Sequence, residues 1–460
     1  MSFSQALSGL NSQAQKLGTI GNNIANSQTV GFKSSNVQFA DVFAGSKVGL
    51  GTRVSSVLQN FNEGNVESTN RNLDLAIAGD GFFRFQDPSG EVVYSRNGQL
   101  SMTAEGNLIN AQGAQIMGFG LNAAGQVQAG GQPVPLNVSA EELDASATTR
   151  VGTTINLDAR KVAGDDLSIV ESSNGEEIEY HYSNNFTVFD SLGNPRNVTI
   201  YYEKIDQEVD DQGRPLYIDN DTDIEYFLAD NGSYYAVGDD PATDPAFDPT
   251  GSPGFGPQSL ENTWQARITM DGYYDAENDF RAAFNQNGTL TQPAGGATAI
   301  NFGADSPLGN DPNPLAFQLN LAGSTQFGNT STVSSLTQDG YTSGTLVGIT
   351  INDDGTIMRN YSNEQSRPAG QVAMVSFRNP EGLTPAGDNV WSASATSGQE
   401  LIGAPGTGLL GSVVSGAIET SNVDMARELV DMIVAQRAYQ ANSQTIKTQD
   451  ELLQTAINLR

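Results

Sequence analysis

The chain contains no cysteine among its 460 residues and a single histidine, His181. The absence of cysteine excludes disulfides, thiolate metal sites and cysteine nucleophiles. His181 lies in the stretch EYHYS and alternates with two tyrosines, which is typical of a surface or sheet residue. A serine nucleophile usually needs a histidine base. A pair of carboxylates could instead catalyse glycan hydrolysis, but no spacing among the many acidic residues singles out such a pair. We therefore predict no catalytic residues.

Basic residues are scarce. The 22 Lys and Arg against 53 Asp and Glu give a net charge of −31. A nucleic-acid-binding protein must neutralise phosphates with Lys and Arg, so this balance argues against nucleic acid as a partner. Charged residues make up 16 % of the chain, against about a quarter in ordinary globular domains. Asn, Gln, Ser and Thr therefore supply much of its polarity.

Long apolar runs are also missing. No stretch approaches the roughly 20 residues of a membrane span, so we expect no membrane insertion. The start MSFSQALSGLNSQ has neither a basic region nor the apolar region of a secretory signal. If the protein is exported, we expect a route without a cleaved signal peptide.

The acidic residues are concentrated in the middle of the chain. Residues 1–62 contain one acid and four bases, whereas residues 141–260 contain 25 acids and 6 bases. We interpret the acidic part as a solvated outer surface. The run from Asp219 to Glu225 is similar to a calcium loop, but Ile224 occupies the position that needs glycine. We predict no metal site and no cofactor.

Both ends of the chain carry a heptad-like pattern that predicts helices over residues 3–27 and from about Asn422 onward. The stripe at the start has a 4,3 spacing through Phe3, Leu7, Leu10, Ala14, Leu17, Gly21 and Ile24. The stripe at the end has a 3,4 spacing through Leu429, Met432, Gln436, Tyr439, Ser443, Ile446, Asp450, Leu453 and Ile457.

Small and polar residues interrupt both stripes, so neither helix would be well buried in an isolated two-stranded coil. Ordering each residue costs roughly 1–2 kcal/mol of backbone entropy, and an interrupted stripe recovers little of that. We therefore expect the helices of many copies to shelter one another. The alternative is an antiparallel helix pair that closes a single monomer.

The interior of the chain is punctuated by glycine every few residues and predicts strands and turns. A chain of 460 residues is too long for one core. We predict a mainly β protein with α-helical termini, paired as a coiled-coil-like inner domain around two or more discontinuous β domains. The predicted parts are an inner domain (1–33 and 415–460), a connector (34–72), a β-rich middle domain (73–147 and 342–405) and an acidic β-rich outer domain (148–341), with room for an extra lobe.

Five blocks of the sequence resemble the axial proteins of the bacterial flagellum, the rod and hook subunits. They are NNIANSQTVGFK (22–33), LDLAIAGDGFF (73–83), YSRNGQLSMTAEGNLINAQGAQIMGF (94–119), NYSNEQSRPAGQVAMVSFRNPEGL (360–383) and SNVDMARELVDMIVAQRAYQANSQTIKTQDELLQTAINLR (421–460). Rod subunits are much shorter. The segments FTVFDSLGNPRNVTIYYEK (186–204) and STQFGNTSTVSSLTQDGY (324–341) resemble the outer domain of hook subunits.

The resemblance implies a structural subunit that self-assembles into the curved, flexible hook, a universal joint that carries torque from motor and rod to filament. It implies an extracellular location in the hook and basal body, with the rod, hook cap, hook–filament junction proteins and flagellar export apparatus as partners. The alternatives are a distal rod subunit and, in another class, a secreted β-rich adhesin or glycan-acting enzyme. The residues we expect to serve assembly are Leu7, Leu10, Leu17, Asn22, Asn23, Ile24, Asn26, Gly31, Phe32, Leu429, Met432, Tyr439, Ile446, Leu453 and Ile457.

Overall fold

The computed structural model describes residues 3–42, 49–207, 216–219, 224–229, 232–239, 241–249, 255–257, 259–303, 306 and 313–458. The chain folds into two compact units. Unit 1 combines Met1–Glu142 with Thr345–Arg460, and unit 2 is the inserted segment Leu143–Gly344. The predicted outer domain, 148–341, lies within unit 2. The further division into inner, connecting and middle parts stays a prediction.

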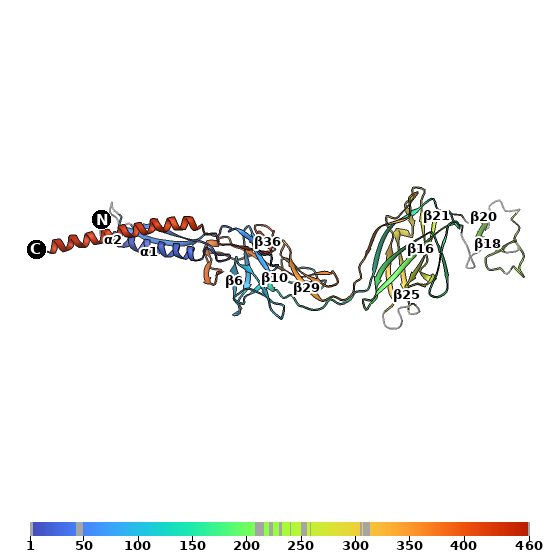
Figure 1. The fold of residues 1–460 in the computed structure, drawn as a ribbon, viewed down its shortest axis with the longest axis horizontal. Helices are drawn as coiled ribbons and strands as arrows, with labels where there is room; N and C mark the ends of the chain where they lie inside the picture. The colour runs from blue at the N-terminus through green and yellow to red at the C-terminus, as the bar shows by residue number, and fades with distance from the viewer. Residues whose placement is uncertain are drawn as a thin grey trace. The chain divides into compact units, whose positions relative to one another are not determined.

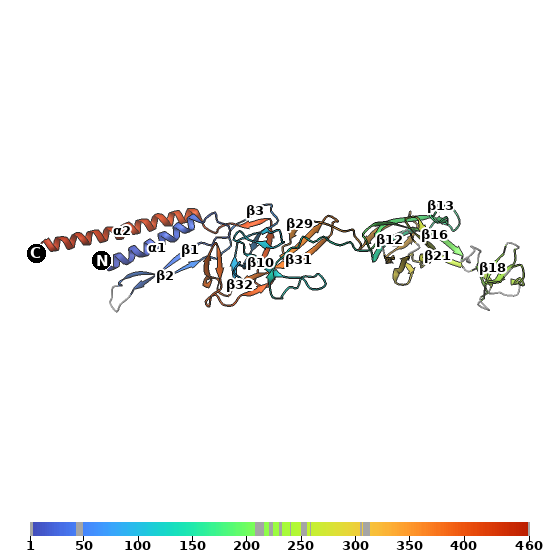
Figure 2. The same cartoon turned by 90° about the horizontal axis from the view of Figure 1, so that it is seen from below.

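The two helices lie at the two ends of the chain and pack together, as Figures 1 and 2 show. Helix α1 is Phe3–Ala25 and helix α2 is Met425–Asn458. Asp424 caps α2, because its Oδ1 accepts hydrogen bonds from the backbone N–H of Ala426 at 3.0 Å and of Arg427 at 3.1 Å. All other regular elements of the described residues are strands or short 3₁₀ turns, so the predicted fold class is confirmed.

Unit 1 is otherwise built of short strands. Those before the insertion are β1 (Ser35–Val42), β2 (Gly51–Gln59), β3 (Val66–Ser68), β4 (Asp74–Ala78), β5 (Phe82–Gln86), β6 (Val92–Ser95), β7 (Gly98–Gln99), β8 (Ser101–Met102), β9 (Leu108–Ile109), β10 (Gln115–Phe119) and β11 (Val134–Pro135). Those after it are β29 (Leu346–Ile351), β30 (Thr356–Tyr361), β31 (Ser366–Val372), β32 (Met374–Ser376), β33 (Thr384–Gly387), β34 (Val390–Ser392), β35 (Leu401–Gly403), β36 (Ser412–Ser415) and β37 (Ala417–Glu419), with a 3₁₀ turn η4 (Pro380–Gly382).

Strands from both halves of unit 1 pair with one another. The largest sheet runs β29-β30-β31-β10-β5-β6-β34-β33, with β8, β9, β11, β32 and β35 attached. Strands β36 and β37 pair with β4 and β3. The predicted inner range from 415 therefore begins in strands, and its helix starts only at Met425. The physical reason is burial, because Ala417 and Glu419 of β37 are buried where this strand pairs with β3.

Unit 2 contains β12 (Arg150–Asp158), β13 (Ser168–Glu171), β14 (Glu177–Tyr180), β15 (Tyr182–Phe189), β16 (Pro195–Gln207), β17 (Leu216–Asp219), β18 (Ile224–Leu228), β19 (Tyr234–Ala236), β20 (Phe255–Pro257), β21 (Ser259–Met270), β22 (Tyr273–Tyr274), β23 (Phe280–Phe284), β24 (Leu290–Gln292), β25 (Ala297–Phe302), β26 (Leu315–Asn320), β27 (Thr325–Phe327) and β28 (Thr332–Gln338). Its short 3₁₀ turns are η2 (Ala276–Asn278) and η3 (Ala294–Gly296).

Two sheets enclose the main core of unit 2. One runs β25-β26-β12-β27, with β28 on the other side of β12, and the second runs β15-β16-β21-β23-β24. Strand β12 alternates between buried and less buried residues, as a strand with one face on a core does. Inward side chains of both sheets, such as Ile155 and Trp264, form one cluster. The sheet β19-β18-β17-β20 has a small apolar cluster of its own around Phe227. That this part of unit 2 forms an extra lobe stays a prediction.

Candidate assembly surface and its anchorage

Helices α1 and α2 run antiparallel along a seam of small and polar residues. Near one end of the seam, a Cβ on Gly9 would lie 2.9 Å from Nδ2 of Asn442. Near the other end, Nδ2 of Asn23 donates a hydrogen bond to Oε1 of Glu428 at 3.0 Å. Ala435 of α2 is only 1 % exposed. The small residues Gly9 and Ala435 let the two helix backbones approach closely.

The seam lies one residue earlier in each helix than the predicted stripes. On α1 the buried residues Ala6, Gly9, Ile20 and Asn23 follow this shifted spacing. Ser12 is also buried, but its hydroxyl donates to the carbonyl of Thr52 in β2 at 3.4 Å. The large apolar residues of the predicted stripes therefore flank the seam. Leu7 is 42 % exposed, Leu429 46 % and Leu453 59 %. The residues of intermediate burial are Leu10, Leu17, Ile24, Met432, Tyr439 and Ile446. The side chain of Ile457 lies outside the described residues.

Helix α2 presents an exposed apolar patch away from α1. Its members Leu429, Val430, Ile433 and Val434 are between 46 % and 60 % exposed. Their spacing of three and four residues places them on adjoining positions of the helix surface. Contiguous exposed apolar side chains on a soluble chain mark an interaction surface. Sequence reasoning found Leu429 but missed the other three, because they fall outside a strict 3,4 stripe.

The hairpin β1–β2 packs against the start of α1 through polar contacts. The side-chain amide of Gln5 donates to the carbonyl of Gly49 at 2.6 Å. The backbone N–H of Thr52 donates to Oγ of Ser8 at 3.2 Å. Gly51 allows this approach, because a Cβ there would lie 2.0 Å from Oγ of Ser8. One side of α1 thus has a hairpin partner and another has α2.

The three asparagines at the end of α1 have different tasks. The side chain of Asn26 donates to the carbonyl of Asn22 at 3.0 Å, which helps to satisfy a carbonyl at the helix end. Asn23 does not cap. Its amide donates to the carbonyl of Ser35 and accepts from the N–H of Ser35, both at 2.9 Å. This pair of bonds ties α1 to the start of β1.

The loop after α1 is held at a glycine. Gly31 has φ of 69°, and a Cβ there would lie 2.8 Å from the backbone nitrogen of Asn97. Its N–H donates to the carbonyl of Glu419 at 2.7 Å. The amide of Asn389 donates to the carbonyl of Val30 at 2.7 Å. Both the left-handed backbone and the close approach exclude a side chain at Gly31.

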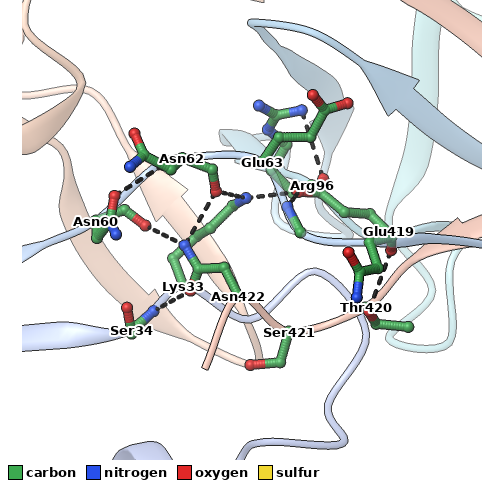
Figure 3. Close-up of polar contacts among 12 residues, drawn as sticks. Lys33, Ser34, Asn60, Asn62, Glu63, Arg96, Glu419, Thr420, Ser421 and Asn422 are labelled. Atoms are coloured by element: carbon green, nitrogen blue, oxygen red, sulfur yellow. Dashed lines mark hydrogen bonds and ion pairs between the residues drawn. The ribbon is translucent and has the colours of Figure 1, made fainter. Parts of the chain in front are cut away.

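A buried ion cluster lies directly after this loop (Figure 3). Nζ of Lys33 lies 2.6 Å from Oε1 of Glu419, and both side chains are fully buried. Nη1 of Arg96, also buried, lies 3.4 Å from Oε2 of Glu419. Nζ of Lys33 also donates to the carbonyl of Asn62 at 2.7 Å, and Gly64 N–H donates to Oε1 of Glu419 at 2.8 Å. One carboxylate thus joins segments next to both helices with the β part of unit 1.

Asn422 adds neutral bonds to the same junction. Its Oδ1 accepts from the N–H of Ser34 at 2.8 Å, and its Nδ2 donates to the carbonyls of Asn60 at 2.7 Å and Asn62 at 3.0 Å. The backbone N–H of Asn422 donates to the carbonyl of Phe32 at 3.4 Å. The chain just before α2 is thereby fixed to the chain just after α1.

Burial lowers the pKa of Lys33 below its ordinary value, and the carboxylate of Glu419 opposes that shift. Sequence reasoning missed Lys33, Arg96, Glu419 and Asn422. Lys33 and Glu419 are 386 residues apart, and no local pattern links them. The only signal was that Lys33 is one of four bases in a segment with a single acid.

Among the described residues no group of three or more His, Asp or Glu side chains could hold a metal ion. The run from Asp219 to Glu225 lies partly outside the described residues. Nε2 of His181 contacts the carbonyls of Val162 and Asp165, and its Nδ1 accepts from the N–H of Lys204 at 3.1 Å. Neither described helix is long and apolar enough to cross a membrane.

Four sequence families match the chain. The flagella basal body rod protein family matches residues 4–33, the D1 domain of flagellar hook protein FlgE/F/G residues 76–162, the D2 domain of flagellar basal body protein FlaE residues 156–341, and the C-terminal family of flagellar basal body rod FlgEFG proteins residues 414–459.

Several relatives that match over the whole chain are named flagellar hook protein FlgE. The flagellar hook protein FlgE of Escherichia coli (strain K12) is 40 % identical over 463 residues, and that of Salmonella typhimurium is 39 % identical over 462, with 100 % of each chain covered. The flagellar hook protein FlgE of Borreliella burgdorferi is 27 % identical over 503 residues, covering 100 % of this chain and 99 % of the relative. The crystal structure of Helicobacter pylori flagellar hook protein FlgE2 matches with a TM-score of 0.48 at 13 % identity, covering 77 % of this chain and 100 % of that one.

Proposed function

The chain belongs to the flagellar hook protein family and is a structural subunit of the hook; we propose that it assembles through the surfaces of α1 and α2 that their own pairing leaves exposed. Hook proteins form a polymer within the flagellum. The relatives match over their whole length, which favours the hook over the distal rod and over a secreted adhesin or glycan-acting enzyme. We assign the chain no catalytic residues.

The observation that carries the proposal is the exposed patch of α2. Val430, Ile433 and Val434 stay more than half exposed although α2 already packs on α1. Removing apolar surface from water is worth roughly 25 cal/mol per Å², so these side chains favour further partners. In a tube, α2 contacts α1 of its own chain and helices of several neighbours. Leu7 and Leu453, which flank the seam, are covered in the same way.

The junction around Glu419 has a mechanical task in this proposal. Torque passes between the helices and the β part of unit 1 only if their connection is stiff. The charges of Lys33, Arg96 and Glu419 are buried together, so separating them would expose unpaired charges to a poorly solvating interior. Gly31 and Phe32, predicted to serve assembly, act here by joining α1 to this cluster.

Unit 2 contains the acidic and polar part of the sequence, which suits the sliding contacts of a flexible tube. When a curved tube rotates, each protofilament lengthens and shortens once in every turn. The outer contacts between neighbouring subunits must therefore slide. Polar, hydrated contacts exchange partners at smaller cost than a packed apolar seam does. We propose that unit 2 lies outside the helices and provides contacts of this polar kind.

We further propose an extracellular location in the hook, reached through the flagellar export apparatus without cleavage of a signal peptide. The partners would be the rod at one end, the hook cap during growth and the hook–filament junction proteins at the other end. The family assignment supports these partners, since a hook connects the rod to the filament.

The test is a charge placed within the exposed patch. Ile433→Glu should abolish or strongly weaken polymerisation in vitro, because each contact would bury a carboxylate. Ile433 is 51 % exposed, so the melting temperature of the free subunit should change little. The matched control is Ile169→Glu, an exposed apolar position on β13 outside the helices, where the native residue is 60 % exposed. Sedimentation and electron microscopy measure the polymers. Normal tubes from Ile433→Glu would contradict the proposal.

A further inference from the structure

Strand β28 forms an unprotected edge of the first unit 2 sheet. It pairs with β12 along one side, from Thr332 opposite Asn156 to Gln338 opposite Val151. No strand of the described residues pairs with its other side. All seven of its residues, TVSSLTQ, are exposed. Soluble proteins usually protect such an edge with charge, proline or a covering segment, because unpaired backbone groups attract another strand.

Two apolar side chains of β28 lie on the core-facing side of the sheet. Leu336 is opposite Thr153, and Val333 is opposite Ile155. Thr153 and Ile155 are buried, whereas Leu336 is 43 % and Val333 38 % exposed. The main core of unit 2 therefore ends at β28 with its last two apolar side chains incompletely covered.

The opposite edge of the same sheet is closed. Strand β25 lies there, and the side chain of Asn278 binds both backbone groups of Asn301. Oδ1 of Asn278 accepts from the N–H of Asn301 at 2.7 Å, and its Nδ2 donates to the carbonyl of Asn301 at 3.0 Å. One edge of the sheet is thus blocked by a side chain that imitates a neighbouring strand, and the other edge has no such protection.

The charge around β28 indicates what covers it. Residues 313–338 contain no charged side chain, in a protein with a net charge of −31. A basic partner would be attracted to the acidic surfaces of unit 2. A second copy of this chain carries the same negative charge, so it can approach most closely where charge is absent.

We propose that the open edge of β28 is the contact surface for unit 2 of a neighbouring copy in the polymer. This inference rests on the proposed function. The neighbour covers Leu336 and Val333 and supplies hydrogen-bond partners to the outer side of the strand. The contact is heterologous, because a tube with distinct rod and filament ends has no two-fold axis between neighbours. The neighbour therefore offers a surface other than its own β28.

The absence of cysteine makes the test direct. Ser335→Cys introduces the only thiol of the chain at an exposed position of β28. The rate of its reaction with a maleimide is measured in free subunits and in polymers. The matched control is Ile169→Cys on β13 of the same unit, where the native residue is 60 % exposed. We expect polymerisation to slow labelling at position 335 at least tenfold and at position 169 less than twofold.

Equal labelling of Ser335→Cys in subunits and polymers would overturn the inference while leaving the proposed function intact. Equal protection at both positions would also overturn it, since the whole unit would then be occluded. Failure of the unsubstituted protein to polymerise would contradict the proposed function itself. As a second measurement, Leu336→Glu should weaken polymers more than Ile169→Glu does, with unchanged thermal unfolding of the free subunits. Equal effects of the two substitutions would count against the β28 edge.

Discussion

Glu419→Gln removes the one carboxylate that serves two buried cations, and its cost tests the role of the junction. The substitution keeps the shape of the side chain but leaves Lys33 and Arg96 buried without the ion-pair partner that they share. Breaking a buried ion pair by removing one partner costs about 3–5 kcal/mol. We expect unit 1 to lose about that much unfolding free energy. Lys33→Met should cost less, about 1–3 kcal/mol, because Glu419 keeps Arg96 as its partner.

The assay uses the two tryptophans of the chain. Trp391 is buried in unit 1 and Trp264 in unit 2. In a Trp264→Phe background, the fluorescence of Trp391 during urea unfolding reports unit 1 alone. All variants are compared in this background, so the cost of the Trp264 substitution cancels.

A partly exposed ion pair of the same unit is the control. Glu400 lies 3.0 Å from Nε of Arg84, and its side chain is 28 % exposed. The pair is less buried than that of Glu419, since the side chain of Arg84 is 11 % exposed, so Glu400→Gln should cost less, about 1–2 kcal/mol. The reasoning is refuted if Lys33→Met costs as much as Glu419→Gln, or if Glu419→Gln costs no more than Glu400→Gln.

Three other outcomes are expected. Gly9→Leu should reduce helix content in circular dichroism and weaken polymers, because a side chain there meets Asn442, whereas Gly18→Leu, with nothing within 4 Å of a Cβ, should not. Burial raises the pKa of Asp279 to about 6 in the folded protein. The folded protein therefore binds a proton more readily than the unfolded chain does, and unit 2 should gain stability as the pH falls from 7 to 5. Asp279→Asn should remove roughly 1 kcal/mol of stability gain between pH 7 and 5, and an unchanged slope in Trp264-monitored unfolding would contradict the assignment. A fragment of residues 143–344 should fold alone with the Trp264 melting curve of the whole protein, because unit 2 has its own core; an unfolded fragment would show that it depends on unit 1.

Local patterns in the sequence were sufficient for the element types. The seven-residue repeat at each end predicted α1 and α2, and glycine punctuation with alternating residues predicted the strands between them. These patterns are reliable because they reflect the geometry of one segment. The absences of cysteine, of basic residues and of long apolar runs likewise depend on composition alone.

The face on which the helices meet was decided by the tertiary structure. The sequence predicted stripes through Leu7 and Leu429, whereas the seam passes through Gly9 and Ala435. Two helices of one chain gain most by close approach, and small residues allow it. The large residues are thereby left for other partners. A periodic pattern contains both sets of positions and does not say which set faces the neighbour within the chain.

The pairing of distant segments also needed the tertiary structure. Lys33 meets Glu419 across 386 residues of sequence, and Asn278 reaches the β25 edge from a different segment to bond with Asn301. The sequence by itself determined the kinds of element, the nested order of the chain and the family to which it is similar. Only folding decided which charges are buried together and which surfaces stay uncovered, because those depend on the packing of segments that no local pattern connects.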